Sequence, residues 1–382
     1  MKKSLICLLM ALALLSFAGC GNKANDDIAG DISSFEEEYE VEEKANIEAD
    51  EELKATSDVK NSLNQAPGCK TIVLANFCAD GEPGQNASLL FADKVAEYSG
   101  GSLYVEVHNK SELGNAQEMA ESVSTGQIEA CLVCEATLDK YDIRYALVPM
   151  PYLYDSYKHA YAVIDGPFRD WVNDGTLESK GLHDVGAWDY GFRNITNSKR
   201  SIEHPTDVAG LKIRTPYEVQ LIYGFESLDA VVSQVSFSEL LTCLDQKTVD
   251  GQENPISTIY NNALWDHNQR YLTMSKHTWE SMNLIINNNF WNSLTDGERE
   301  AIEKASKDAQ ASMREEVQSS EEEYIQKCRD KGMTVVDEID KNEFRASMSD
   351  AYSRMSEYVG DQAMVDKMFE IVDEVRSSIK NN

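Results

Sequence analysis

Apolar positions from residue 70 onward alternate between strand-like and helix-like spacing. Residues 71–77 (TIVLANF) and 128–134 (IEACLVC) are mainly apolar, and residues 102–108 alternate between apolar and polar. Between these runs, residues 86–98 and 115–125 place apolar side chains at helical spacing. Short apolar runs are typical of strands, and a 3.6-residue period is typical of helices. The resulting β-α-β-α-β order predicts a parallel sheet covered by helices.

A second α/β unit is predicted after this first one. Strands are expected at residues 184–188, 192–197 and 211–214. Helices are expected over residues 218–227 and 237–247, where the period changes back to that of a helix. The chain is therefore predicted to be of the α/β class and to contain two such units.

The C-terminal third is predicted to be mainly helical. Thr295 and Glu298 have the spacing of a capping box, and the helix that follows is expected to run to about Cys328. A short strand is expected at Val335 and Val336, and more helix over residues 342–378.

The first 66 residues are predicted to lie outside the fold. Residues 1–19 combine Lys2 and Lys3 with an apolar run that is too short to span a bilayer comfortably. The small residues before Cys20 resemble a bacterial lipobox, which implies cleavage there, acylation of Cys20 and anchoring to the cell membrane as a lipoprotein. An ordinary secretory signal with an incidental cysteine is the alternative.

Acidic residues dominate the chain, which has 382 residues and a formal net charge of −31. Residues 21–66 hold 14 acids and 4 lysines with few apolar residues, so residues 20–66 are expected to form a disordered acidic tether. Residues 67–382 still hold 52 acids against 29 bases. A field of this sign repels phosphate backbones, so nucleic-acid binding is excluded.

Several sequence motifs for catalysis are absent. The sequence lacks a P-loop, a GxGxxG fingerprint after a strand, an HExxH motif and a GxSxG motif. Cys131 and Cys134 form a CxxC, but on a predicted strand they point to opposite faces, which suits neither a shared metal nor a mutual disulfide. We therefore expect no metal, no cofactor and no catalytic residue.

Three segments carry the most information about function. They are residues 207–216 (DVAGLKIRTP), 236–240 (SFSEL) and 249–255 (VDGQENP), with Gly191-Phe-Arg193 upstream. In order and spacing they resemble the extracytoplasmic substrate-binding proteins of TRAP (tripartite ATP-independent periplasmic) transporters, over roughly residues 70–380.

The resemblance implies a two-lobed, periplasmic-binding-protein-like fold with a hinge and a long helix that spans both lobes. Within a body of residues 67–382, lobe I is expected mainly at 70–190 and lobe II mainly at 191–290. Helices in 295–380 are expected to pack across both lobes. The implied function is that of a solute receptor, a monomer that captures a small organic acid between closing lobes and delivers it to a TRAP-type membrane permease.

The resemblance also implies which residues hold the acid. Arg214 matches an arginine that makes a two-pronged ion pair with the ligand carboxylate, and Arg193 matches a second arginine that reaches the ligand. Asn254 matches an asparagine that hydrogen-bonds the carboxylate, and Phe237 matches an aromatic residue that packs on the ligand. The alternatives are a structural ion pair, a surface pair, a turn cap and ordinary core packing, respectively.

Weaker candidates are expected to line the same cleft, with core or lobe packing as the competing interpretation: Asn86, Phe77, Cys134, Glu135, Trp188, Asp189, Tyr217, His277 and Trp279. One departure from the family pattern concerns Asp229, which stands where a glycine is usual. It requires a backbone conformation that aspartate tolerates.

Two other classes of function stay open at this level. The same receptor could present its ligand to a membrane signalling protein, in which case neighbouring genes would encode a sensor kinase. A hinged hydrolase is the other class, although no nucleophile–base pair is visible in the sequence.

Overall fold

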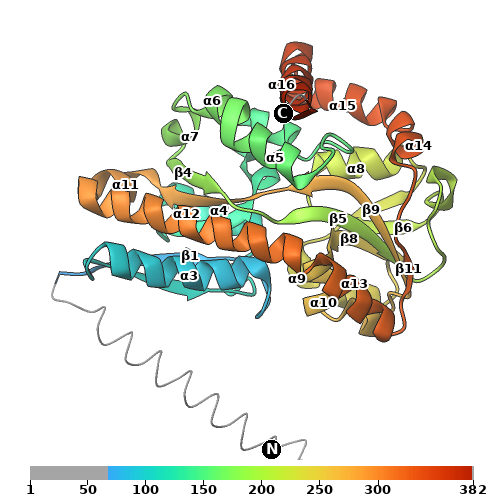
Figure 1. Cartoon of the computed structure of the whole chain (residues 1–382), viewed down its shortest axis with the longest axis horizontal. Coiled ribbons are helices and arrows are strands. Elements are labelled where there is room, and N and C mark those ends of the chain that lie inside the picture. Colours follow the sequence, from blue (N-terminus) through green and yellow to red (C-terminus); the bar gives the residue numbers. More distant parts are fainter. Residues whose placement is uncertain (1–67, 381–382) are drawn as a thin grey trace, which may run out of the picture. The chain divides into compact units, whose positions relative to one another are not determined.

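The computed structural model describes residues 68–380. The predicted signal peptide, the tether and Cys20 lie outside the described residues. The described part belongs to one unit, Asn64–Asn382, and is built on two mixed sheets with helices packed around them (Figure 1).

Sheet A contains the first parallel unit expected from the sequence. Its strand order is β2 (Leu103–His108), β1 (Lys70–Ala75), β3 (Ala130–Cys134), β10 (Met282–Asn287) and β4 (Leu182–Ala187). The strands β1, β2 and β3 are parallel, whereas β10 runs antiparallel to both of its neighbours. Helices α3 (Pro83–Tyr98) and α4 (Ala116–Thr125) connect the parallel strands, as predicted.

Sheet B forms the second lobe. Its order is β11 (Thr334–Val336), β9 (Tyr271–Glu280), β5 (Gly191–Asn197), β8 (Gly251–Pro255), β6 (Lys212–Thr215) and β7 (Val231–Gln234). Strand β6 is parallel to β7 and β8, whereas β5 is antiparallel to β8 and β9. Three helices follow strands of this sheet: α8 (Val219–Glu226), α9 (Phe237–Asp245) and α10 (Ile256–Asn261). Asp229 has φ +58°, a left-handed conformation that aspartate tolerates, as predicted.

Two short segments join a strand of one sheet directly to a strand of the other, and the chain crosses a third time through the helical segment between β10 and β11. The first crossing is the segment 188–190 between β4 and β5, and the second is Ser281 between β9 and β10. Residues 282–287 therefore belong to sheet A, although the sequence placed residues 191–290 mainly in the second lobe. Gly191, at the first crossing, has φ +104°, and a Cβ there would lie 3.1 Å from Val317, so a side chain is disfavoured.

The long helix after Thr295 is divided between the lobes. Helix α12 (Asp296–Ser319) starts with the predicted capping box and packs on α3 and β4, whereas α13 (Glu321–Asp330) packs on α10. The expectation of one helix to about Cys328 was wrong. The Ser320 hydroxyl donates to the Glu316 carbonyl (2.7 Å), a local bond that competes with helix continuation.

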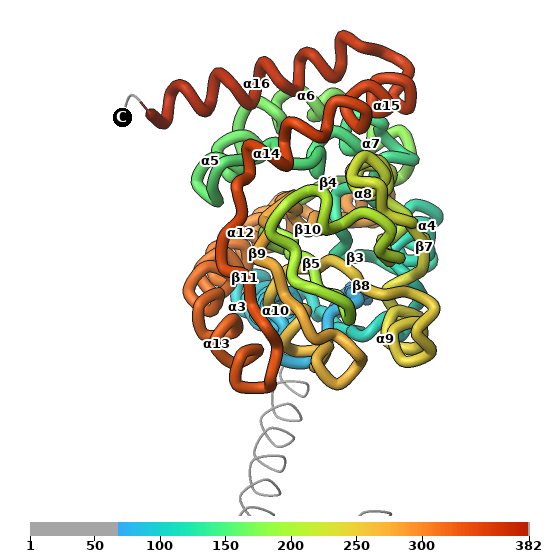
Figure 2. Tube along the Cα trace, turned by 90° about the vertical axis from the view of Figure 1, so that its right-hand side faces the viewer, coloured from blue at the N-terminus to red at the C-terminus, as the bar shows by residue number. Residues whose placement is uncertain are grey.

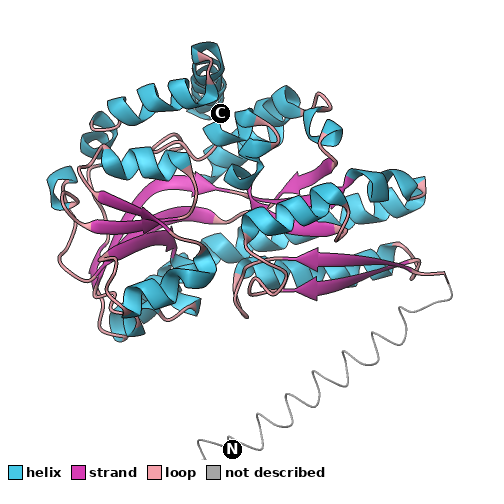
Figure 3. Cartoon of the chain, turned by 180° about the vertical axis from the view of Figure 1, so that it is seen from behind, coloured by secondary structure: helices cyan, strands magenta, loops and turns pink. Residues whose placement is uncertain are grey.

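The remaining helices cover the two sheets from outside (Figure 3). They are α5 (Tyr157–Val163), α6 (Arg169–Val172), α7 (Thr176–Ser179), α11 (Asn288–Ser293), α14 (Lys341–Ala346), α15 (Ser349–Val359) and α16 (Gln362–Lys380). Figure 2 shows α14, α15 and α16 at the same end as α5, and α15 packs on α8 while α16 packs on α5. Among residues 68–380, no helix has the length and apolar character needed to cross a membrane.

Candidate functional site: a cationic cavity between the sheets

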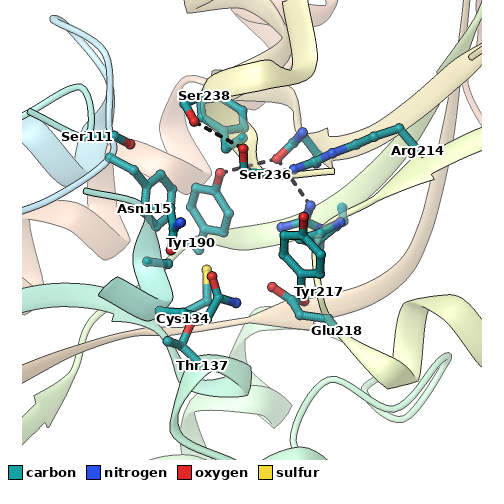
Figure 4. A pocket seen from close by; sticks show the side chains of 17 residues that line it. Ser111, Asn115, Cys134, Thr137, Tyr190, Arg214, Tyr217, Glu218, Ser236 and Ser238 are labelled. Atoms are coloured by element: carbon teal, nitrogen blue, oxygen red, sulfur yellow. Dashed lines mark hydrogen bonds between the residues drawn. The ribbon is translucent and has the colours of Figure 1, made fainter. Parts of the chain in front are cut away.

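A cavity of about 50 Å³ lies where the parallel strands of both sheets end (Figure 4). Sheet A and its loops contribute Phe77, Ser111, Asn115, Cys134 and Thr137, and sheet B contributes Arg193, Arg214, Tyr217, Glu218, Phe237 and Asn254. Ligands of open α/β sheets bind at the carboxyl ends of strands. Ligand pockets usually measure about 300–1,000 Å³, so the walls must move apart to admit a molecule of several heavy atoms.

Arg214 supplies a buried guanidinium with unused hydrogen-bonding capacity. It lies on β6, one residue before the end of the strand, and is 1% exposed. Its Nε donates to the carbonyl of Val235 (2.8 Å), which fixes the guanidinium beside the start of α9, whereas its Nη2 has no partner among residues 68–380. Burial, opposed by Glu253 and reinforced by Arg193, lowers the pKa of Arg214 to about 10. The group therefore stays charged at neutral pH, and its planar fork suits a carboxylate.

Arg193 lines the same cavity, but protein carboxylates already hold it. Its Nε and Nη2 donate to the Glu253 carboxylate (2.5 and 2.7 Å), and its Nη1 donates to Glu280 Oε2 (2.8 Å). Burial alone would lower the pKa of Arg193, but the negative charges of Glu253 and Glu280 outweigh this effect and hold the pKa well above its ordinary value. The structure thus places Arg193 at the cavity in a buried ion pair, and not in the surface pair that was the alternative weighed from the sequence.

Asn254 lies on β8, between the strands that carry the two arginines. Its Oδ1 accepts from Tyr190 Oη and from Arg193 Nη2, both at 3.2 Å, and its Nδ2 donates to Gln252 Oε1 (2.5 Å). Because an amide nitrogen carries two N–H groups, one remains for a ligand.

The start of α9 forms another wall of the cavity. Ser236 is its N-cap residue, and no side chain caps the first turn. A helix N-terminus attracts anions. Phe237 is half-buried there, with its ring centroid 5.9 Å from that of Phe77, and Tyr217 is 50% exposed at the rim. The structure therefore brings Phe237, Phe77 and Tyr217 to the cavity.

The floor of the cavity is acidic, which the sequence did not indicate. Glu218 lines it, and a carboxylate oxygen of Glu218, one of Glu280 and the thiol of Cys134 lie within 4.8 Å of one another. Burial, and then the negative charge of Glu280, raise the pKa of Glu218 well above its ordinary value. These three groups could hold a cation, but Arg193 already occupies Glu280 and opposes a metal ion there.

Three predicted residues, Trp188, Asp189 and Trp279, lie in or next to the crossing segments and outside the cavity lining. Trp188 is fully buried and donates to Ser306 Oγ (3.0 Å) on α12. Asp189 accepts from Trp279 Nε1 (2.9 Å) and from the Tyr161 hydroxyl. Burial raises the pKa of Asp189 to about 7. These contacts hold the crossing segments in place, and none of these side chains lines the cavity.

Three other predicted residues also lie outside the lining. Asn86 is exposed and donates to Glu316 (2.8 Å), which links α3 to α12. Glu135 is buried and accepts from Ser281 (3.2 Å) at the second crossing. His277 lies behind the ion pair, with its Nε2 3.3 Å from Glu253 Oε2, so it supports Glu253.

Among the residues of the site that were not identified from the sequence, four carry its polar contacts: Tyr190, Glu218, Glu253 and Glu280. Glu253 is the immediate neighbour of Asn254, so its motif was visible but its pairing with Arg193 was not. Glu218 and Glu280 are isolated glutamates that lie 62 positions apart in the sequence, so no local pattern could have found the pair that the fold brings together.

Two mixed sheets covered by helices, strand-to-strand crossings between them and an interlobe cavity with a buried arginine define a two-lobed ligand-binding protein. The model of the family described as bacterial extracellular solute-binding protein, family 7, matches residues 74–358. This chain belongs to that family, and the predicted assignment to TRAP transporter substrate-binding proteins is confirmed.

Individual relatives agree with this assignment. A solute-binding protein of Verminephrobacter eiseniae is 30% identical over 274 residues, which cover 72% of this chain and 81% of that protein. The protein y4mM of Sinorhizobium fredii is 29% identical over 319 residues, 83% of this chain, and the alignment spans 58% of y4mM. The sugar acid binding protein DctPAm of Advenella mimigardefordensis, solved in complex with galactonate, is 28% identical with a TM-score of 0.76, covering 81% of this chain and 100% of that one.

Proposed function

We propose that this protein is an extracytoplasmic receptor that captures a small organic acid between its lobes and delivers it to a TRAP-type permease. The ligand carboxylate binds Arg214, with the Asn254 amide and the start of α9 as further donors. Ligand binding shifts the population toward the closed conformation, because the ligand contacts both walls of the cavity only in that conformation. The protein acts by binding alone, without chemical turnover.

The observation that carries this proposal is the unpartnered Nη2 of a charged arginine that is 1% exposed. A buried charge without a partner is unfavourable, and it persists in a folded protein where a ligand completes it. The similar protein DctPAm binds galactonate, a sugar acid, which supports a carboxylate as the missing partner.

The test begins with the ligand that the protein carries. Mass spectrometry after denaturation identifies co-purified acids, and calorimetry with those acids then compares wild type with Arg214→Met. We expect a loss of about 1,000-fold in affinity, equivalent to roughly 4 kcal/mol for a buried charge pair.

Arg329→Met is the matched control, since Arg329 is an arginine on α13 that pairs with Asp337 and does not line the cavity. It should bind as wild type. Equal affinity of Arg214→Met and wild type would refute the proposal.

We further propose that a lipidated Cys20 anchors the receptor to the outer face of the cell membrane. The support is the lipobox-like sequence before Cys20, which lies outside the described residues. The full chain should incorporate labelled palmitate in its bacterial host, and Cys20→Ala should abolish both the label and membrane fractionation. A labelled Cys20→Ala protein would contradict the anchor.

A further inference from the structure

A buried glutamate outside the cavity lining bridges the two lobes. Glu82 is the N-cap residue of α3 and is 1% exposed. Its Oε1 accepts from the backbone N–H of Ala79 (3.2 Å) and from Asn262 Nδ2 (2.7 Å), and its Oε2 lies 3.1 Å from Thr258 Oγ1. Thr258 lies on α10 and Asn262 is the C-cap residue of that helix, so a carboxyl group of the first lobe is held by polar groups of the second.

A line of polar atoms leads from this carboxyl group into the cavity wall. Thr258 Oγ1 lies 3.2 Å from Tyr190 Oη, and Tyr190 Oη lies 3.2 Å from Asn254 Oδ1. Thr258 is fully buried, whereas Tyr190 is part of the cavity lining (Figure 4). The contacts form a relay of three links that runs through Glu82, Thr258, Tyr190 and Asn254.

The number of protons in the relay depends on Glu82. Arg193 Nη2 donates to Asn254 Oδ1 (3.2 Å), and because a guanidinium accepts no hydrogen bond, this contact fixes the amide oxygen as an acceptor at the end of the relay. The hydroxyls of Thr258 and Tyr190 bring one proton each. When Glu82 is ionised, two protons serve three links and one link is lost. When Glu82 carries a proton on Oε2, all three links are made.

The surroundings of Glu82 favour the protonated form. Burial raises its pKa, against the hydrogen bonds that it accepts, and no Lys, Arg or His of the described residues pairs with it. Two titratable groups near it are the Cys78 thiol and the Tyr190 hydroxyl, and burial raises the pKa of each well above its ordinary value, so both are uncharged. On α12, the carboxylate of Glu316 is held by Asn86 (2.8 Å).

Resting on the function proposed above, we propose that Glu82 is a positioning residue that couples ligand binding to the uptake of a proton. The protonated carboxyl completes the relay and thereby orients the Asn254 amide that donates to the ligand. Glu82 itself does not touch the ligand. Binding of the acid and protonation of Glu82 favour each other reciprocally, so the affinity for the acid falls as the pH rises and Glu82 ionises.

Calorimetry at pH 5.5 and pH 8 tests this coupling, since an ordinary organic acid is ionised at both values. The probes are galactonate, the acid bound by DctPAm, and each acid that mass spectrometry identifies in the purified protein. We expect wild type to bind about fivefold more tightly at pH 5.5, the effect of one hydrogen bond. Binding should also take up protons, which makes the measured heat depend on the ionisation enthalpy of the buffer.

Glu82→Gln imitates the protonated acid, because its amide donates to Thr258 at every pH. It should bind at both pH values about as tightly as wild type does at pH 5.5, without proton uptake. Thr258→Val keeps the shape of the side chain and removes the middle hydroxyl, so it should bind as weakly at pH 5.5 as at pH 8. Glu316→Gln is the matched control. Burial raises the pKa of Glu316 too, but this residue is outside the relay, so the variant should keep the pH dependence of wild type.

The coupling would be overturned if wild type bound equally well at both pH values, or if either Glu82→Gln or Thr258→Val kept the full pH dependence. Binding of the acid through Arg214 would stand in each of these cases. Failure of the function itself would look different, because no acid would then bind wild type, or Arg214→Met would bind it equally well. Both proposals would fall with that result.

Discussion

Arg214 and Arg193 lie on two strands of one sheet, both almost fully buried, and yet their surroundings are opposite. Arg193 donates to two carboxylates and its charge is fully compensated. Arg214 donates to one backbone carbonyl and keeps an unpartnered Nη2. Both residues match arginines that were expected to reach a ligand. From this contrast we expect the arginine with free bonding capacity, Arg214, to be the one that binds the ligand.

The largest effect on stability is expected at the compensated arginine. Arg193→Met leaves the carboxylates of Glu253 and Glu280 buried without a cation, and breaking a buried pair in this way costs about 3–5 kcal/mol. Thermal unfolding should show a strong decrease in Tm. A Tm within about one degree of wild type would mean that the ion pair contributes little to stability, and the contrast between the arginines would fail.

Asp189 is an anionic counterpart to Arg214, since it is buried and its hydrogen bonds come from the neutral groups of Tyr161 and Trp279. Arg314 nearby lowers its pKa, but burial dominates and raises it to about 7. The native state therefore binds a proton more tightly than the unfolded state. This group favours folding most at low pH and loses that contribution as the pH rises from about 4 to about 7.

Asp189→Asn should remove this dependence. We expect the variant to gain stability relative to wild type at pH 8 compared with pH 5, by about 1–3 kcal/mol, as measured by chemical unfolding at both values. A difference between variant and wild type that is the same at both pH values would exclude titration of Asp189 in this range.

Arg214→Met should change the stability of the ligand-free protein in the opposite direction from Arg193→Met. Replacing an unpartnered buried charge with an apolar side chain of similar length removes its desolvation penalty, so we expect a gain of about 1–2 kcal/mol. Thermal unfolding of ligand-stripped protein measures it. A clear loss of stability would show that Arg214 is needed for packing.

The smallest effect concerns the approach of the ligand. The body carries 52 acids against 29 bases, so it repels an anion at long range, whereas Arg214 attracts it locally. Stopped-flow association should become faster by about twofold as salt rises from 50 to 500 mM, because salt screens the repulsion. A slower rate would mean that the field of the cavity itself dominates.

Much of sheet A and the helices could be predicted from the sequence, because their apolar periodicity is local. Strand β8 could not, since its sequence Gly-Gln-Glu-Asn-Pro has no apolar pattern, although all five residues are buried. Their polar groups are satisfied by tertiary partners, such as Arg193 for Glu253. Strand β10 is apolar, but its place between β3 and β4 depends on pairing between residues more than 90 positions apart.

For the site, Arg214, Asn254 and Phe237 were found through their motifs, and the structure places all three at the cavity. Their contact with a ligand stays a prediction. Trp188 and Asn86 were placed at the cleft because their chain neighbours lie near it, but their side chains turn toward α12. The direction of a side chain at a crossing strand is set by packing, which a sequence pattern does not record.

The position of β10 at the centre of sheet A also has a consequence for synthesis and export. Strands β3 and β4 do not pair with each other. Strand β10 lies between them and pairs with both, and it ends at Asn287. During translation the first lobe therefore remains an incomplete sheet, with unpaired strand edges, until most of the chain has emerged. Such late, long-range pairing slows folding and leaves edges open to aggregation. It also keeps the chain unfolded for longer, which is the state that a secretion channel accepts.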